Sequence, residues 1–331
     1  SFAAGTAASA PPARAPAPLS SSYLWVRAGL PLAALVPASL ALSVSRARAA
    51  LALAALACHA MVSAGRSSFR LPTLPVEDFP AISSNELPVN FSLTAADMRD
   101  LIDATRFAIS TEETRYYLNG IYIHKAESGE LCAVATDGHR LAMTRQALPS
   151  GAAQMPSIIL PRKAVSELRK LLDDFDGDVL VGLSETRAEF RFGVVRLTSK
   201  LIDGTFPDYT RVIPVGNDRI MQVDVSAFSA AVDRVSTIAS EKSRSVKMVL
   251  RSGVLTLSAS NTDASSATEE LEVSYDGPEM EIGFNARYLL DIAGQVNSDM
   301  IEFALADQGS PSLVRAPGDE ASLFVLMPMR V

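Results

Sequence analysis

Cysteine and histidine are scarce in this chain of 331 residues, which has only Cys58, Cys132, His59, His124 and His139. Two cysteines cannot build a disulfide framework, and the five residues do not have the spacing of paired metal ligands. Cys58 next to His59 lies in an alanine-rich stretch without further ligands. The sequence therefore predicts no metal, no cofactor and a reducing compartment.

Acidic residues are absent from residues 1–76, which also lack lysine and contain six arginines. The rest of the chain holds 24 basic and 37 acidic residues, a net charge of −13. Neutralisation of phosphates by lysine and arginine supplies most non-specific affinity for DNA. This charge excludes a conventional tight DNA-binding protein, so any contact with DNA must be local and weak.

Residues 1–61 are rich in alanine, proline, serine and arginine. Uncharged runs at 28–45 and 49–65 approach the length of a membrane span, but Pro31 and Pro37 interrupt the first run, and membrane helices are not favoured. A transit peptide is a second interpretation, because such peptides are rich in arginine and poor in acids. Out-of-frame translation of a GC-rich gene, or a fusion, is a third.

Helices and strands alternate in the following part of the chain. A helix is predicted after Thr94, a good N-cap, with apolar residues at helical spacing over 98–109. A second helix is predicted to begin at Pro161, since proline suits the first turn. Residues 115–125 are rich in tyrosine and isoleucine, and residues 179–192 alternate between apolar and polar, so both predict strands.

An internal repeat organises these elements. Residues 91–113 align with 221–242 as a strand followed by a helix. In the same way, residues 157–160 lead into the helix at Pro161, and residues 280–284 lead into a later helix. The repeat predicts an α+β fold of two tandem domains, each a duplicated unit of one helix and several antiparallel strands.

Six short motifs occur in a fixed order along the chain. They are Arg115–Gly120 (RYYLNG), Ala135–Ala142 (ATDGHRLA), Ser199–Gly204 (SKLIDG), Phe206–Tyr209 (FPDY), Gly283–Asn285 (GFN) and Met327–Arg330 (MPMR). In this order and at this spacing they resemble the bacterial sliding clamp family, the beta subunit of DNA polymerase III. The resemblance covers roughly residues 62–331.

The resemblance implies an architecture. A family subunit has three clamp domains, and two subunits form a ring with helices lining a central hole and sheets outside. Residues 62–86 resemble the end of the first domain, and nothing before them does. The predicted organisation is an unassigned segment 1–61, a first-domain remnant 62–86, a central clamp domain 88–213 and a third clamp domain 218–331.

The resemblance also implies a function, that of a processivity factor that encircles duplex DNA and has no active site. A ring needs no tight DNA contact, which is compatible with the net charge of −13. The implied partners are duplex DNA, the catalytic subunit of the replicative polymerase, the clamp loader, repair polymerases and mismatch-repair proteins. The expected location is the bacterial cytoplasm, with an organelle as the minor alternative. The alternative function is a truncated clamp paralogue that acts only as a peptide-binding module.

Three sets of site residues follow from the resemblance. The implied DNA contacts are Arg115, Tyr116 and Tyr117. The implied groove for partner peptides consists of Leu118, Thr136, Gly138, His139, Arg140, Leu141, Pro207, Arg211, Val212, Asn285, Tyr288, Val325, Leu326, Met327, Pro328, Met329 and Arg330. The implied subunit interface consists of Phe69, Leu71, Thr237 and Ile238. The thioethers in the tail suit a surface that receives varied apolar peptides.

Two other candidate sites are rejected on the residues themselves. Asp137 and His139, two residues apart on a predicted strand, would face the same side, but no nucleophile motif accompanies them. The acidic run 173–178 resembles a calcium loop, yet Val179 occupies the position that needs glycine.

The tyrosines Tyr116 and Tyr117, predicted on a strand, should point to opposite faces.

Ring closure is the remaining expectation. The family joins its first domain to the third domain of the next subunit, and here the strand around Phe69 lacks the rest of its sheet. Residues 1–60 offer few strand formers and several prolines. We therefore expect this chain to be mostly monomeric, with the family homodimer doubtful, and not to stay on circular DNA.

Overall fold

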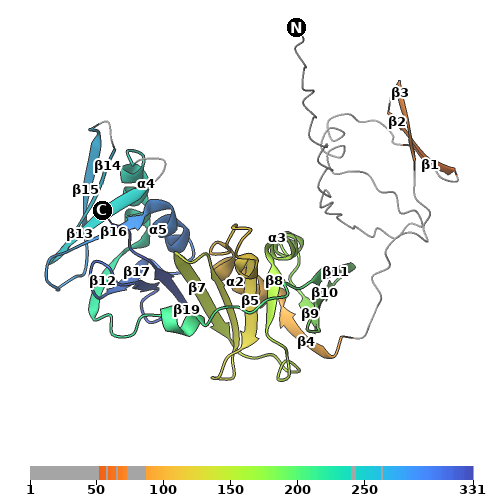
Figure 1. The fold of residues 1–331 in the computed structure, drawn as a ribbon, viewed down its shortest axis with the longest axis horizontal. Coiled ribbons are helices and arrows are strands. Elements are labelled where there is room, and N and C mark those ends of the chain that lie inside the picture. The colour runs from red at the N-terminus through yellow and green to blue at the C-terminus, as the bar shows by residue number, and fades with distance from the viewer. Residues whose placement is uncertain are drawn as a thin grey trace, which may run out of the picture. The chain divides into compact units, whose positions relative to one another are not determined.

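The computed structural model describes residues 52–56, 59–64, 66–72, 87–239, 244–261 and 264–330. The chain divides into two compact units, residues 1–84 and residues 85–331 (Figure 1). Because the two units are not placed relative to one another, each is described by itself.

The first unit contains a three-stranded antiparallel sheet. Its strands are β1 (Ala52–Leu56), β2 (His59–Ala64) and β3 (Ser67–Pro72), in the order β1-β2-β3. The strand around Phe69, β3, was expected to lack its neighbours but pairs with β2, and β1 and the start of β2 lie in residues 1–60, which were expected to offer few strand formers. Strand propensity is weak compared with pairing to neighbouring strands, so alanine-rich segments can still join a sheet.

The second unit is built from four repeats of one pattern, a strand, a helix and three strands. The first repeat is β4 (Val89–Thr94), α2 (Ala95–Arg106), β5 (Gly120–Lys125), β6 (Leu131–Thr136) and β7 (Arg140–Gln146). The second is β8 (Ile158–Pro161), α3 (Arg162–Leu171), β9 (Asp178–Leu183), β10 (Arg187–Phe192) and β11 (Val195–Lys200). We call these two repeats the central half.

The C-terminal half contains the other two repeats. The third repeat is β12 (Arg219–Asp224), α4 (Val225–Ser236), β13 (Ser245–Arg251), β14 (Val254–Ser260) and β15 (Ser266–Glu272). The fourth is β16 (Met280–Asn285), α5 (Ala286–Ala293), β17 (Met300–Leu305), β18 (Ser312–Arg315) and β19 (Ser322–Leu326). The predicted α+β fold of duplicated units is confirmed.

The repeats interlock in pairs. The leading strand of each repeat pairs with the meander of its neighbour, as β4 with β9, β8 with β5, β12 with β17 and β16 with β13. The two halves then join through β7 and β19, giving one long sheet in the order β12-β17-β18-β19-β7-β6-β5-β8. Each half also has a separate four-stranded sheet, β11-β10-β9-β4 or β15-β14-β13-β16.

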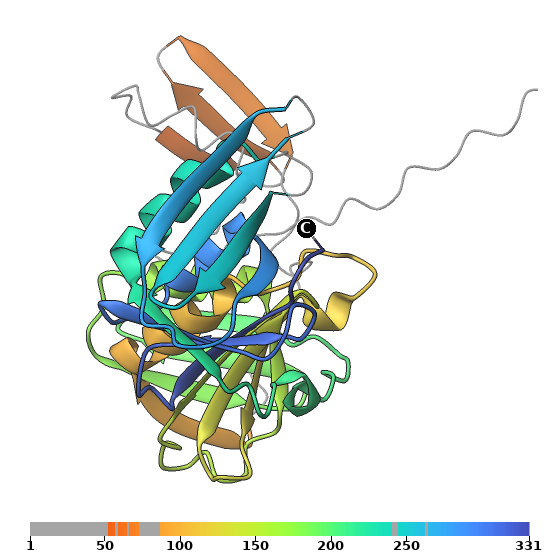
Figure 2. The ribbon, with the colours of Figure 1, turned by 90° about the vertical axis from the view of Figure 1, so that its left-hand side faces the viewer.

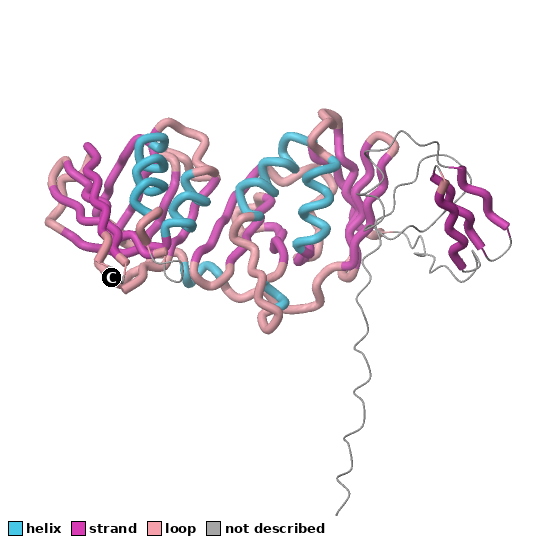
Figure 3. Tube along the Cα trace, turned by 90° about the horizontal axis from the view of Figure 1, so that it is seen from above, coloured by secondary structure: helices cyan, strands magenta, loops and turns pink. Residues whose placement is uncertain are grey.

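The helices pack in two pairs, α2 with α3 and α4 with α5 (Figure 3). In the C-terminal half, α4 lies against the strands β13 to β15 (Figure 2). Helix-facing residues of the long sheet, such as Ile121, Phe303 and Phe324, belong to the main hydrophobic core. Among the helices that the structure describes, none is long and apolar enough to span a membrane.

Short-range signals explain where the helices begin. The hydroxyl oxygen of Thr94 accepts a hydrogen bond of 3.0 Å from the backbone N–H of Asp97, so the predicted N-cap is confirmed. Asp224 caps α4 in the same way, through the N–H of Ala227 at 2.7 Å. Pro161 ends β8 rather than opening α3, because it pairs with Gly120 in the sheet. The helix therefore begins one residue later than predicted.

Two predicted strand positions are wrong. Tyr116 and Tyr117 lie in a 3₁₀ turn, η2 (Tyr116–Leu118), and their rings meet edge to face at 5.8 Å instead of pointing to opposite faces. Asp137 and His139 lie in the loop between β6 and β7 and not on a strand. In both cases local hydrogen bonds, described below, compete with strand pairing.

Candidate functional site at the seam of the long sheet

The seam between the two halves is the antiparallel pair β7 and β19. Across it, Val325 lies opposite Leu141 and Leu326 lies opposite Arg140. Alternate residues face away from the helices and form a second hydrophobic cluster, which we call the outer cluster. It contains Leu118, Cys132, Val134, Leu141, Met143, Ile159, Phe206, Tyr209 and Val325. The structure thus brings together and buries three predicted groove residues, Leu118, Leu141 and Val325.

Residues 201–213, which we call the connector, cover the outer cluster. The ring of Phe206 stacks on Tyr122 with centroids 4.7 Å apart and an interplanar angle of 4°. The hydroxyl of Tyr209 lies 3.0 Å from Nε2 of His124 and 3.7 Å from the thiol of Cys132. These anchors hold the intervening part of the connector at the surface, where Pro207, Arg211 and Val212 are exposed.

Burial favours the neutral forms of three groups where the connector meets the sheet. Burial lowers the pKa of His124, and it raises the pKa values of the Cys132 thiol and the Tyr209 phenol. Desolvation is the largest cause in all three, since burial penalises whichever form is charged. Within the described residues no group of three or more histidine, cysteine or acidic side chains could hold a metal ion.

The loop between β6 and β7 has a fixed shape. One carboxylate oxygen of Asp137 accepts hydrogen bonds from the backbone N–H groups of His139 and Arg140, at 2.9 and 3.0 Å. Gly138 has a φ of +89°, a left-handed conformation that favours glycine. A Cβ atom there would also lie 2.6 Å from Nη1 of Arg115. The loop therefore presents His139 at the surface in one conformation.

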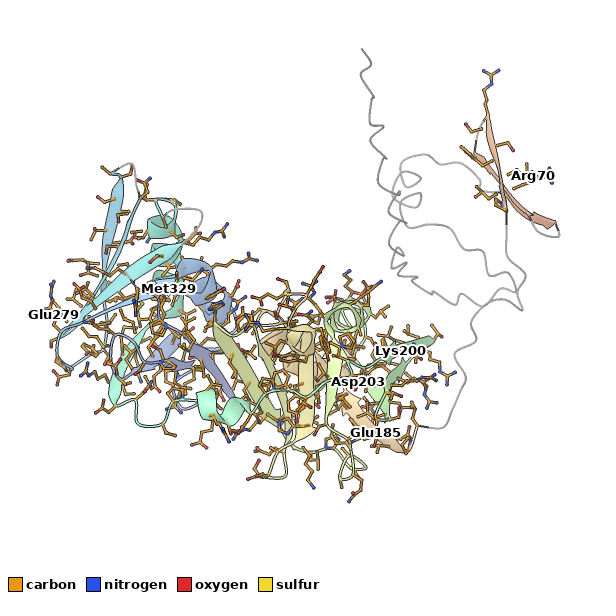
Figure 4. The ribbon with its side chains drawn as sticks, viewed as in Figure 1. Arg70, Glu185, Lys200, Asp203, Glu279 and Met329 are labelled. Atoms are coloured by element: carbon orange, nitrogen blue, oxygen red, sulfur yellow. The ribbon has the colours of Figure 1, made fainter. Side chains whose placement is uncertain are left out.

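The C-terminal tail lies beside this loop. The N–H of Met327 donates to the carbonyl of His139 at 2.9 Å, and the N–H of Met329 donates to the carbonyl of Gly283 at 2.7 Å. Strand β19 ends before Met327, as Pro328 allows no further ladder pairing. Figure 4 labels Met329 on the C-terminal half. The tail thus connects the β6–β7 loop to strand β16.

Helix α5 supplies the other predicted residues. Asn285 caps it by accepting from the N–H of Arg287 at 3.0 Å, and the ring of Tyr288 lies over the ring of His139 with centroids 6.4 Å apart. The accessible predicted residues at the seam form what we call the seam surface. They are Thr136, Gly138, His139, Asn285, Tyr288, Met327, Pro328, Met329 and Arg330.

Arg140 differs from its neighbours on the seam surface, because its side chain is only 8% exposed. It lies beneath the surface, as do Leu118, Leu141, Val325 and Leu326. Sequence reasoning grouped these five with the surface residues, since neighbouring positions in a motif carry no information about burial. In the structure these five residues form a buried layer that supports the accessible residues of the seam surface.

The predicted DNA-contact residues lie close to the seam surface. Arg115 donates two hydrogen bonds to the carboxylate of Glu112, at 2.8 and 3.0 Å, and its guanidinium covers Gly138. Tyr116 is 54% exposed, and Tyr117 is half-buried against Gly204 of the connector. Leu118, the next residue of the same turn, is part of the outer cluster.

One basic surface was missed by the sequence reasoning. Arg162, Lys163 and Lys170 of α3 are exposed, while Ala164, Val165 and Leu168 of the same helix are buried. Their positions follow directly from the spacing of the apolar residues on the helix. The apolar spacing in residues 162–171 therefore predicts that these basic residues lie on the exposed face of the helix, in a chain whose net charge is negative.

The four predicted interface residues lie in different units. Phe69 and Leu71 lie on β3, where Phe69 is 51% exposed. Thr237 and Ile238 follow the end of α4. Thr237 lines a pocket of about 390 Å³ between α4 and α5, together with Leu290 and Asp291.

Comparison with protein families decides the identity of the fold. The central-domain model of the DNA polymerase III beta subunit matches residues 92–208, and the C-terminal-domain model of the same subunit matches residues 210–330. The chain belongs to the beta sliding clamp family. The order of motifs, the four repeats and the continuous sheet are therefore features of a sliding clamp.

Relatives and solved structures agree with this assignment. The beta sliding clamp of Caulobacter vibrioides is 51% identical over 274 residues, which are 82% of this chain and 74% of the relative. The clamp of Escherichia coli K12 is 38% identical over 275 residues, with the same two shares.

Among solved structures, the Bartonella birtlesii clamp bound to griselimycin has a TM-score of 0.83 at 48% identity. The match covers 89% of this chain and 81% of that one. A Caulobacter crescentus clamp has a TM-score of 0.80 at 50% identity, covering 85% and 76%, and holds polyethylene glycol in a region assigned to beta-motif tethering.

Proposed function

We propose that this protein acts as a sliding clamp, a non-catalytic subunit of the bacterial DNA polymerase III complex that tethers the polymerase to duplex DNA. The observation that carries the proposal is the continuous sheet through β7 and β19, with two interlocked repeats on each side, in a chain that both clamp-domain models match. The alternative, a module that only binds peptides, is not favoured, because a relative that matches 82% of this chain is named a beta sliding clamp. The proposed location of the protein is the bacterial cytoplasm, where the replicated DNA lies.

In this proposal DNA is held by weak phosphate contacts, and by topology only where two copies close a ring. Arg162 and Lys163 of α3 supply exposed positive charge, Lys170 adds less because it pairs with Glu167 at 3.4 Å, and Tyr116 adds an exposed ring that can pack against the sugars of the backbone. Arg115 contributes less, since Glu112 already occupies its guanidinium. Few contacts and a net charge of −13 outside residues 1–76 favour sliding over tight binding.

The seam surface is the proposed binding site for partner peptides. Met327 and Met329 offer flexible apolar contacts, while His139 and Tyr288 offer two rings. The backbone of the tail and loop is fixed by hydrogen bonds, so little entropy is lost on binding. Its partners are proposed to be the polymerase catalytic subunit, the clamp loader, repair polymerases and mismatch-repair proteins, each through a short segment with a glutamine and apolar anchors.

Peptide titration tests this proposal. We expect a synthetic peptide with one glutamine and two large apolar anchors to bind with a Kd on the order of micromolar, and Met327→Ala to weaken it about tenfold. Leu141→Asp should abolish binding, but Leu141 is buried, so that variant must also be checked for folding. Val215→Ala, in an exposed linker, is the control. Unchanged affinity in Met327→Ala would reject the site.

Contact between copies is proposed to use Phe69 and Leu71 of one chain and Thr237 and Ile238 of the next. The exposed phenyl ring of Phe69 has a volume that the pocket beside Thr237 can accept. Sedimentation of the chain as a function of concentration measures this association directly. A Phe69→Ala variant should shift the equilibrium further toward the monomer that the sequence leads us to expect.

A further inference from the structure

The side chain of Arg140 crosses the seam and connects four points of the structure. Its Nε donates to the carboxylate of Asp137 at 3.1 Å, its Nη1 donates to Asp291 of α5 at 2.5 Å, and its Nη2 donates to the carbonyl of Phe107 at 2.7 Å. Its guanidinium carbon lies 5.1 Å from the centre of the Phe107 ring and 4.3 Å from that of Tyr288. Each guanidinium nitrogen therefore already has an acceptor within the protein.

From these contacts we propose that Arg140 does not contact a partner peptide itself. It is the positioning residue that fixes the distance and orientation between the two sides of the seam surface. The inference rests on the proposed peptide-binding function of that surface. One side is the β6–β7 loop, which Asp137 shapes and which presents His139. The other is α5, which carries Tyr288 and Asp291.

The chemistry of this position requires arginine. A planar fork can donate in three directions at once and can also lie against aromatic rings, whereas the lysine ammonium is a point charge on a flexible stem. Burial strengthens the requirement, because a charge that is 8% exposed depends on its acceptors to replace water. Lysine at this position would keep the charge but would lose at least one of the connections.

Asp291 makes the inference testable, because it is not a residue of the seam surface. It lines the pocket between α4 and α5, with Thr237 and Leu290, and its only other ion-pair partner among the described residues is Arg287 at 3.9 Å. If Arg140 acted by touching the peptide, loss of the Asp291 carboxylate would leave the affinity unchanged. If Arg140 acts by position, loss of Asp291 must weaken binding.

The experiment measures peptide affinity in the full chain for Arg140→Lys, Asp291→Asn and the double variant, using the peptide with one glutamine and two apolar anchors. We expect about tenfold weaker binding for Arg140→Lys and about fivefold for Asp291→Asn, with the double variant close to Arg140→Lys alone, because coupled residues are not additive. Arg169→Lys is the matched control. Arg169 pairs with Asp103 between α2 and α3, so that variant should lower stability without changing affinity.

A spectroscopic readout separates positioning from general loss of stability. The ring of His139 lies over Tyr288, so its carbon-bound protons report the distance between the two sides of the surface. These NMR signals should shift in Arg140→Lys and Asp291→Asn, and not in Arg169→Lys. Unchanged affinity or unchanged His139 signals in Asp291→Asn would overturn the inference, and so would equal weakening in Arg169→Lys. If Met327→Ala also left binding intact, the peptide site itself would be wrong.

Discussion

The outer face of the long sheet has a different character in its two halves. In the central half, most of the residues that point away from the helices are apolar and buried under the connector, among them Val134, Leu141 and Ile159. In the C-terminal half the apolar face continues only beside the seam, at Val325 and Leu313, and farther out Glu302 of β17 lies on the same face. It accepts hydrogen bonds of 2.9 Å from both Gln222 and Arg315.

The two halves have the same order of helices and strands. The difference between their outer faces therefore comes from the side chains, which decide whether another segment packs on each face. An apolar face gains from losing water and recruits the connector, whereas a polar row satisfies its own hydrogen bonds and needs no cover. The connector therefore docks on the central half, next to the seam. Its anchors Phe206 and Tyr209 therefore pack in the same cluster as Leu141 and Val325 of the seam.

The largest effect should follow from making the central half polar. Val134 is 0% exposed, so Val134→Asp places an unpaired carboxylate in the outer cluster and should lower the free energy of unfolding by about 4 kcal/mol. The opposite change, Gln222→Val, removes one donor to Glu302, which keeps Arg315, and should cost about 2 kcal/mol. Urea unfolding of both variants tests this, and similar losses would mean that the two halves do not differ as described.

Removal of the connector anchor should have the next largest effect. Phe206→Ala deletes the ring that stacks on Tyr122, and we expect a loss of about 3 kcal/mol in the free energy of unfolding, as for other buried aromatic residues. Peptide affinity should fall as well, because the connector would no longer be fixed at the seam. Val215→Ala is the matched control, since Val215 is 95% exposed in the same stretch of chain. A Phe206→Ala protein of wild-type stability would show that the connector does not depend on this ring.

The smallest effect should come from acid. Burial lowers the pKa of His124 below its usual value near 6.5, so the unfolded state takes up a proton at a higher pH than the folded state does. Stability is then full above about pH 6.5 and falls as the pH drops through the folded pKa. A His124→Gln variant should lose less stability than the wild type between about pH 7 and pH 5. An equal pH dependence in the two proteins would exclude His124 as the cause.

Much of the fold was predictable because its signals are local. The apolar spacing after Thr94, the alternation over 179–192 and the similarity of 91–113 to 221–242 each depend on residues close together in the chain. The resemblance to clamps was likewise carried by short motifs, and the family assignment is confirmed. The domain boundaries at 88–213 and 218–331 stay predictions.

Burial and turn geometry at the site were not predictable in the same way. Tyr116 and Tyr117 have the composition of a strand, but the turn is fixed by the N–H of Leu118, which donates to the carbonyl of Arg115 at 2.9 Å, and by the packing of Leu118 in the outer cluster. Similarly, nothing in the motif around Asp137 distinguishes an accessible His139 from a buried Arg140. These outcomes depend on which elements pack against the motif.

Residue order alone was sufficient for the repeats, the N-cap at Thr94, the acidic balance and the family, because each depends on composition or on contacts within a few positions. The role of Arg140 needed the folded chain. Its acceptors Phe107 and Asp291 are 33 and 151 positions away, and no periodicity relates residues at such separations. The packing of α2 on β7 brings Phe107 to Arg140, and the pairing of β7 with β19 joins the half that carries Asp291, so that several distant acceptors converge on one buried guanidinium.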